Sequence, residues 1–213
     1  RLAGFLLMRI LAWGKDNRFD DIRENIFKLA GFWVLQAIWV WTVSLPLTVL
    51  NSDIVDHDLN ALDYIGWIIA IAGFSIEAVA DIQKLWYKKY TSTEHWCDTG
   101  LWYWSRHPNY FGEILVWWGL FMSVANILAD WEWCVIISPL FITFLLLFVS
   151  GIPIQERGHY KKYCSSDLEE PYLQYRKQTS PLVPLPPIVY EKIPSLLKIF
   201  LFEFPFYKAP TNE

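Results

Sequence analysis

The residues of this sequence best suited to chemistry lie in residues 99–113, which read TGLWYWSRHPNYFGE. Arg106 and His107 directly precede Pro108, and an apolar run begins at about Phe111. Proline is favoured at the first position of a helix, so the sequence predicts a helix that begins at Pro108. The free amide groups of a helix N-terminus attract phosphate, and an arginine can hold a phosphate through two parallel hydrogen bonds. The stretch therefore either binds a phosphate-bearing ligand or is an aromatic helix start at the membrane interface with a solvated Arg106–His107 pair.

Two pairs of polar residues share a spacing of four and therefore a helix face. Asn109 and Glu113 form one pair, and Glu77 and Asp81 form the other within an apolar stretch. A carboxylate inside a membrane is costly, so it indicates function unless it lies at the interface. The structural alternative is that Glu77 and Asp81 pair at the interface with the lysines that follow them, among them Lys88.

Composition excludes several classes of protein. The chain has 213 residues, of which 54% are hydrophobic and 18% aromatic, with 13 Trp, which is too apolar for a soluble domain of this length. The net charge of -4 gives no basic excess that would indicate a nucleic-acid partner. The three cysteines are far apart and form no cluster with histidine, so we expect no metal site and no disulfide framework.

The distribution of apolar residues predicts an all-α, multi-pass transmembrane bundle that forms a single membrane domain over residues 1–213. Four stretches have the length and apolarity needed to cross a bilayer: residues 30–50, 62–82, 111–129 and 134–153. We also expect a partial helix at residues 2–13 and a charged surface helix at residues 14–28. Residues 193–206 are apolar but too short to span, so they predict an interfacial or re-entrant helix.

Positive charges predict the orientation of the bundle. All 18 Lys and Arg residues fall in residues 1–28, 84–106 and 157–208, which share one face if there are four spans. The positive-inside rule places that face toward the cytosol or the mitochondrial matrix, in the endoplasmic reticulum or the mitochondrial inner membrane. The same face receives the ends of the spans that carry Asp81, Asn109 and Glu156. A mixed acidic and basic pocket there would suit a ligand with phosphates and sugar hydroxyls.

Several ordered motifs extend this interpretation: RHPNYFGE, SGIPIQE and YRKQTSPLVPLPP follow the helix that carries Glu77 and Asp81. Together they resemble the steroid 5-alpha-reductase-like membrane family over most of the chain, from about residue 18 to residue 187. The resemblance implies that residues 62–187 bind NADPH and that hydride passes to a carbon–carbon double bond, either conjugated to a ketone or within a sterol.

The resemblance also implies which residues line the cofactor site. These are Asp81, Lys88, Asn109, Tyr110, Glu113, Glu156, Tyr175 and Arg176, with Arg106 and His107 in the same motif. Glu77 stands where characterised steroid reductases have asparagine, and we add it because it shares a helix face with Asp81. Tyr110 is a candidate proton donor, although a tyrosine packed at an interface is more common.

Three functions are compatible with these motifs. The first is an NADPH-dependent reductase of a lipid-like enone or sterol double bond. The second is an S-adenosylmethionine-dependent membrane methyltransferase, since isoprenylcysteine and phospholipid methyltransferases share a RHPxYxG motif. Asn109, Glu113 and the absence of a glutamate pair at 156–157 favour the reductase. The third is a non-catalytic membrane subunit that retains the fold within a larger assembly. Membrane lipids, and for the third function other membrane subunits, are the expected partners.

Overall fold

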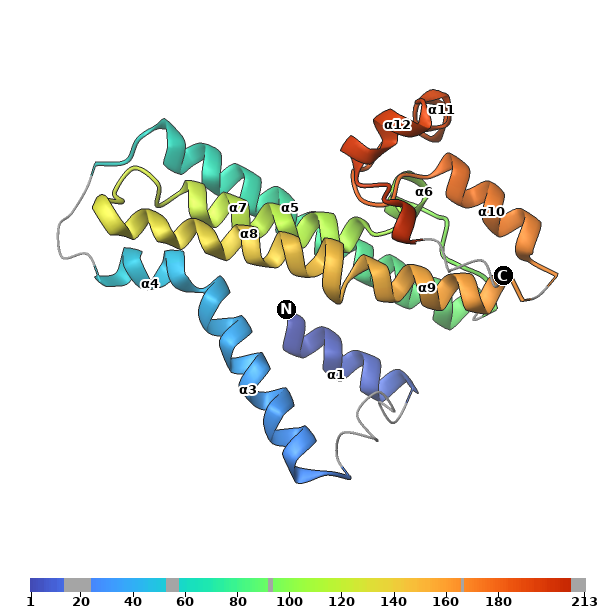
Figure 1. The fold of residues 1–213 in the computed structure, drawn as a ribbon, viewed down its shortest axis with the longest axis horizontal. Coiled ribbons are helices and arrows are strands. Elements are labelled where there is room, and N and C mark those ends of the chain that lie inside the picture. Colours follow the sequence, from blue (N-terminus) through green and yellow to red (C-terminus); the bar gives the residue numbers. More distant parts are fainter. Residues whose placement is uncertain (14–23, 53–57, 92–93, 166, 208–213) are drawn as a thin grey trace.

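The fold of the chain is helical, as the sequence predicts. The computed structural model describes residues 1–13, 24–52, 58–91, 94–165 and 167–207. Within these residues there is no strand, and one isolated bridge joins Ser105 and Ser180. Most of the predicted charged surface helix, residues 14–23, lies outside the described residues. Figure 1 shows a bundle of long helices, with several shorter helices gathered over one end.

The centre of the bundle is an antiparallel pair of helices, α5 (Ala61–Tyr90) and α7 (Pro108–Met122). Two glycine pairs bring the two backbones together. A Cβ atom added to Gly112 would lie 2.6 Å from the Gly73 carbonyl oxygen, and one added to Gly66 would lie 2.6 Å from the Gly119 carbonyl oxygen. Small residues of this kind allow membrane helices to approach closely. The approach places the polar face of α5 against the polar face of α7.

The helix α7 is shorter than the predicted span 111–129. It has 15 residues and is therefore about 22 Å long, less than the roughly 30 Å of a bilayer core. It ends at Met122 and is followed by turns, in which Asn126 donates a hydrogen bond of 3.2 Å to Asp63 at the start of α5. The described residues thus contain three helices long and apolar enough to cross a membrane, rather than four: Ile26–Val43, Ala61–Tyr90 and Asp130–Tyr163. The chain is an integral, multi-pass membrane protein.

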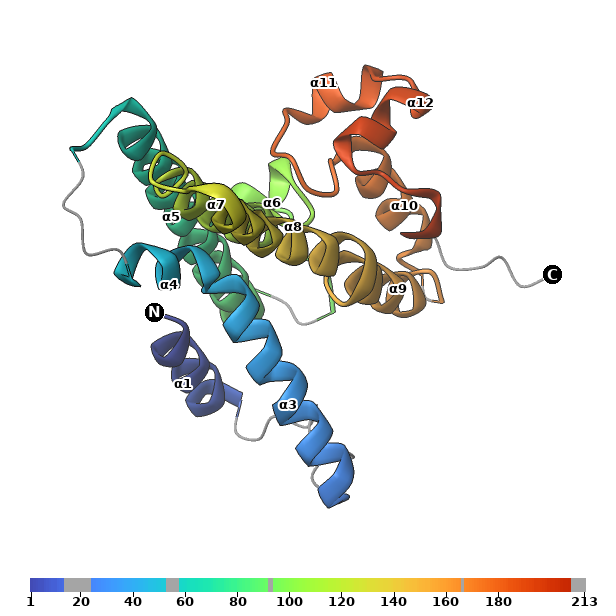
Figure 2. The same ribbon diagram turned by 60° about the vertical axis from the view of Figure 1, so that its left-hand side comes forward.

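The predicted first span, residues 30–50, is divided in two. Helix α3 (Ile26–Val43) ends just before Pro46, and α4 (Leu45–Ser52) continues in another direction. This confirms the kink expected from a proline, which has no N–H for the helix. Figures 1 and 2 show α3 projecting from the bundle beside α1 (Leu2–Trp13).

The last long helical run bends near Gly151 and continues past residue 153, where the predicted span 134–153 ends. It passes through a 3-10 segment η2 (Asp130–Ile136), α8 (Ile137–Phe144) and a π-helical turn η3 (Leu145–Val149). The helix then resumes as α9 (Ile152–Tyr163), with Pro153 in its first turn, where a missing N–H does no harm. The bend directs α9 toward the end of the bundle where α5 terminates.

Short helices cover that end of the bundle (Figure 1). They are α6 (Leu101–Trp104), α10 (Glu169–Gln178), α11 (Pro187–Lys192), α12 (Ser195–Lys198), η4 (Ile199–Leu201) and η5 (Pro205–Tyr207). The predicted interfacial helix 193–206 is therefore broken into short turns. Its end folds back onto the bundle, because the buried Tyr207 hydroxyl donates a hydrogen bond of 2.8 Å to the Leu147 carbonyl.

Candidate functional site

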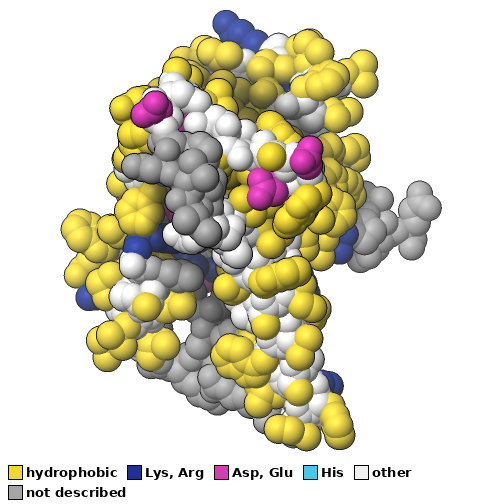
Figure 3. All heavy atoms as spheres, turned by 90° about the vertical axis from the view of Figure 1, so that its left-hand side faces the viewer, with side chains coloured by type: hydrophobic (Ala, Val, Ile, Leu, Met, Phe, Trp, Pro, Cys, Tyr) yellow, Lys and Arg dark blue, Asp and Glu magenta, His cyan; other side chains and the backbone are white. Residues whose placement is uncertain are grey.

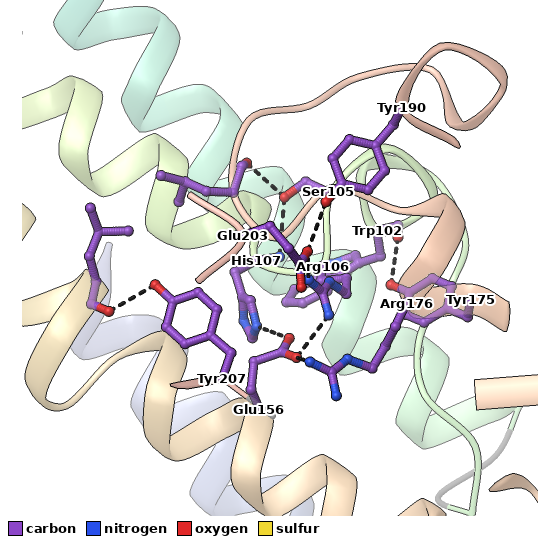
Figure 4. A network of polar contacts seen from close by, with 12 residues as sticks. Trp102, Ser105, Arg106, His107, Glu156, Tyr175, Arg176, Tyr190, Glu203 and Tyr207 are labelled. Carbon is purple, nitrogen blue, oxygen red and sulfur yellow. Dashed lines mark hydrogen bonds and ion pairs between the residues drawn. The ribbon is translucent and has the colours of Figure 1, made fainter. Parts of the chain in front are cut away.

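A buried ion network lies where α7 begins and α9 passes it (Figure 4). Its centre is Glu156 of α9, which is 1% exposed. The carboxylate accepts hydrogen bonds from Arg106 Nη1 at 2.9 Å and from His107 Nε2 at 2.8 Å. Arg176 Nη2 of α10 forms an ion pair with it at 3.2 Å. Four of the predicted site residues, from three separate segments, are therefore brought together.

The backbone around Ser105 holds Arg106 and His107 of the RHP motif in place. The Arg106 N–H donates to the Ser180 carbonyl at 2.8 Å, and the Ser105 hydroxyl donates to the Leu182 carbonyl at 2.7 Å. His107 is the N-cap residue of α7, with Pro108 following at the first helical position as predicted. The proline-rich segment after α10 thus fixes the loop that carries Arg106 and His107.

A second carboxylate, Glu203, completes the network and was missed by the sequence reasoning. It forms an ion pair with Arg106 Nη2 and accepts a hydrogen bond of 2.8 Å from the Tyr190 hydroxyl. The signal was present, because Glu203 is the lone carboxylate of the apolar run SLLKIFLFEFPF. A buried charge normally requires a partner of opposite sign, and that rule alone would have predicted a cation facing it.

Burial governs the protonation of this network. Burial lowers the pKa of His107 below its ordinary value, although the hydrogen bond that His107 donates to Glu156 opposes the shift. Burial also disfavours the charge on Arg106, but the carboxylates of Glu156 and Glu203 outweigh it and hold its pKa above the ordinary value. Neutral His107 therefore donates from Nε2 to the Glu156 carboxylate, while two arginines balance two glutamates.

A cavity of about 110 Å³, which we call the basic pocket, borders this network. Four of its lining residues are cationic: Lys84 and Lys88 of α5, Lys162 of α9, and Arg106. Glu156, already engaged by the network, is the carboxylate that lines it among the described residues. Such a concentration of positive charge with little negative charge suits an anionic ligand.

Aromatic rings form much of the remaining wall of the basic pocket. The Trp96 ring centre lies 5.1 Å from that of Tyr172, 5.3 Å from Tyr163 and 5.5 Å from Tyr175. The Tyr175 hydroxyl donates to the Trp102 carbonyl at 3.0 Å. Rings held in this way exclude water and give a flat group a surface to stack against.

Two hydrogen-bond donors on the lining residues are left over. Trp96 Nε1 and Arg106 Nε are both buried, and neither has a hydrogen-bond partner within the described part of the chain. A buried donor without a partner costs free energy that a ligand acceptor would recover. The donor set of the basic pocket therefore fits a phosphate-bearing cofactor.

The carboxylate pair of α5 and the polar pair of α7 form a separate polar cluster. Asn109 interacts with the Asp81 carboxyl, and Glu113 lies near Glu77 and Asp81. Arg1 forms an ion pair with Glu77 and donates to Asp81 at 3.0 Å. The structure therefore divides the single mixed pocket that the sequence predicted. These four residues meet in a cluster of their own, whereas Glu156 meets Arg106 in the ion network.

Of the remaining predicted residues, some line the basic pocket and one does not. Lys88 and Tyr175 line the basic pocket. The ring of Tyr110 stacks on His107, with centres 5.5 Å apart and planes 11° apart, and it packs against the apolar core of the bundle. This position places Tyr110 beside the ion network rather than on the wall of the basic pocket.

Comparison with known proteins gives the family of the chain. No curated protein and no solved structure matches it. Residues 1–179 match the model of a family described as Protein of unknown function (DUF1295). The match covers the ion network except Glu203, all of the lysines of the basic pocket and the polar cluster. The chain therefore belongs to the DUF1295 family, which is distantly related to membrane proteins of the steroid 5-alpha-reductase and isoprenylcysteine methyltransferase type.

Proposed function

We propose that the protein is a membrane-embedded, NADPH-dependent reductase of a carbon–carbon double bond in a lipid-like enone or a sterol. The observation that carries this proposal is the basic pocket, in which four cations and two buried donors without partners border one small cavity. Phosphate is the group that such a donor set recognises best. The resemblance of the motifs to steroid reductases supplies the reaction.

The size of the basic pocket limits which part of NADPH it takes. At about 110 Å³ it is smaller than the roughly 300–1,000 Å³ that sites for drug-sized ligands occupy. We therefore assign it to a phosphate-bearing portion of the cofactor. The polar cluster on α5 and α7, with the Asp81 carboxylate and the Asn109 amide, is suited to hydroxyl and carboxamide groups.

The residues of the chain have defined tasks in this proposal. NADPH, when bound, supplies a hydride to the double bond. Lys84, Lys88 and Lys162 neutralise phosphate charge, while the aromatic wall keeps water out. Adding hydride to an enone leaves negative charge on oxygen, so the reaction also needs an acid. Tyr110 remains our candidate for that acid.

A methyltransferase is the second candidate, and one observation favours it. The polar cluster already surrounds a cation, the Arg1 guanidinium, with the carboxylates of Glu77 and Asp81. A sulfonium ion is also a cation, so S-adenosylmethionine would suit that cluster. It has no phosphate, however, so its single carboxylate is a poorer match than a phosphate for the four cations of the basic pocket.

A ligand screen separates these functions. The full chain, purified in an uncharged detergent, is heated with NADPH, with S-adenosylmethionine and with ATP as a polyanion control. We expect NADPH to raise Tm, because a ligand at a hundred times its Kd stabilises by about 2.7 kcal/mol. A shift with S-adenosylmethionine alone would favour the methyltransferase. No change in Tm with either cofactor would favour a non-catalytic subunit. Equal increases in Tm with ATP and NADPH would show that the basic pocket binds anions without specificity.

A further inference from the structure

A second and larger cavity borders the same ion network. Its volume is about 580 Å³, and it lies between α9, α10 and the short C-terminal helices α11, α12 and η4. Arg176 and Glu203 of the network line it, whereas Arg106 and Glu156 line the basic pocket. Most of its C-terminal wall lies beyond residue 179, where the family match ends. This cavity has no role in the cofactor site proposed above.

The cavity has one basic wall and one apolar wall. The basic wall consists of Arg176, Lys177 and Lys198, and the apolar wall includes Leu173, Leu196 and Phe204. The Lys198 ammonium lies 4.0 Å from the centre of the Tyr190 ring and donates to the Lys177 carbonyl at 3.1 Å, so its position is fixed. The Glu203 carboxylate also lines the cavity, but Arg106 and Tyr190 already bind it.

The basic wall extends from a buried base to an accessible mouth. Arg176 is 7% exposed, whereas the side chain of Lys177 is 66% exposed. The ion pair with Glu156 uses Arg176 Nη2, but that atom has no well-oriented hydrogen bond within the described residues. An anionic group entering the cavity would therefore meet a buried guanidinium at its base and ammonium groups nearer the mouth.

The mouth of the cavity is at a surface suited to lipid. Leu196 is 76% exposed and its neighbour Phe200 is 79% exposed, with Leu197 also exposed between them. Exposed apolar side chains next to Lys192 and Lys198 are typical of a segment that lies at the membrane interface. Lys192 and Lys198, which lie close to them in the sequence, would attract anionic lipid head groups.

We propose that this cavity binds an anionic amphiphile, with its charged group at the basic wall and its hydrocarbon chain along the apolar wall. The volume is within the range of sites that hold drug-sized ligands. The site requires both parts of the ligand, because each wall contributes one kind of contact. It does not depend on the reductase activity.

Three soluble probes test the two walls in the full chain in uncharged detergent. They are a lysophosphatidate, a monoacylglycerol with the same chain, and glycerol phosphate. We expect the lysophosphatidate to bind about tenfold or more tightly than the monoacylglycerol, because a hydrogen bond to a charged group contributes about 1.5–3 kcal/mol. Glycerol phosphate should bind no more tightly than the monoacylglycerol. Equal affinity for lysophosphatidate and monoacylglycerol would show that the basic wall contributes nothing to binding. Equal affinity for lysophosphatidate and glycerol phosphate would show that the site binds free phosphate rather than an amphiphile.

Matched variants locate the binding. Leu196→Asp and Phe200→Asp add the same charge at similarly exposed positions, but only Leu196 lines the cavity. Likewise Lys198→Gln and Lys192→Gln remove the same charge, and only Lys198 lines it. We expect Leu196→Asp and Lys198→Gln to weaken lysophosphatidate binding about tenfold, with unchanged affinity in the two controls. Leu196 is too exposed to support the fold, so unchanged affinity in Leu196→Asp would overturn the proposal.

Discussion

Glu156 is the residue on which the arrangement of the candidate site depends most. One carboxylate joins the loop before α7, through Arg106 and His107, to α10 through Arg176. A buried ion pair adds little net stability over a well-packed apolar pair, but removing one partner leaves an uncompensated charge. The network therefore holds the loop before α7 against α9 and α10, and substitution of one member should lower the stability of the fold.

Glu156→Gln tests this role directly. The amide keeps the shape of the side chain but removes the carboxylate that pairs with Arg176 and leaves Arg106 with Glu203 alone, so we expect a loss of about 3–5 kcal/mol in the free energy of unfolding. The measurement is unfolding in detergent at neutral pH. The control is Glu24→Gln, an exposed glutamate, which should change stability by less than about 0.5 kcal/mol. Equal stability of the two variants would show that Glu156 is not buried as a charge.

The buried His107 makes the stability of the fold depend on pH in the acidic range. Its pKa in the folded protein is below the ordinary 6.5 because of burial, so the unfolded chain binds its proton first as pH falls. The contribution of neutral His107 is complete above about pH 6.5 and is lost progressively as the pH falls toward the folded pKa. We expect Tm to fall below pH 6.5 and the fall to be smaller in His107→Asn. If Tm fell with pH as steeply in His107→Asn as in the unaltered chain, another group would cause the loss of stability. The control is His95→Asn, because the ring of His95 is exposed.

At the scale of elements, the close pairing of α5 and α7 positions the polar cluster. Gly112 packs on the Gly73 carbonyl. A Cβ atom added to Gly112 would also lie 2.7 Å from the Glu77 backbone nitrogen. The glycine contacts thus fix the distance between the Glu77 face of α5 and the Glu113 face of α7. A larger residue at the contact would separate the two helices.

Gly112→Ala is the matching experiment. The new Cβ would lie 2.6 Å from the Gly73 carbonyl oxygen, so the helices must shift, and we expect a loss of about 1–3 kcal/mol. Gly31→Ala in α3 is the control, since nothing lies within 4 Å of its Cβ position. Alanine there should leave stability unchanged or raise it by up to about 1 kcal/mol. A tolerated Gly112→Ala would contradict the close helix pairing.

At the scale of the whole molecule, the exterior is that of a membrane protein. Phe27, Leu35 and Trp41 of α3 are largely exposed, and Figure 3 shows hydrophobic side chains over much of one face. The candidate span Ile26–Val43 has only 6% of its residues buried inside the protein, so lipid must cover the rest. Lys84 and Lys88 of the basic pocket follow the apolar part of α5, and Lys162 lies in the last turn of α9.

Much of this arrangement could be predicted from sequence, for identifiable reasons. Apolar runs predicted the helical class, three of the four expected spans in outline, and the helix that begins at Pro108. The order of the spans predicted that Arg106 and Glu156 lie at the same end of the bundle. The end of α7 at Met122 could not be predicted, since the apolar run continues beyond it to residue 129. The place of Glu203 depends likewise on how short C-terminal turns fold back, and no periodic pattern encodes that.

The direct test of the central claim is the NADPH affinity of two matched double variants. Lys88→Gln with Lys162→Gln removes two cations of the basic pocket, while Lys28→Gln with Lys192→Gln removes two exposed cations elsewhere. We predict that the first pair weakens NADPH binding about a hundredfold or more, since each charged hydrogen bond contributes about 1.5–3 kcal/mol and two are removed. The second pair should leave the affinity unchanged. Equal affinity in the two double variants, or no NADPH binding by the unaltered chain, would contradict the account.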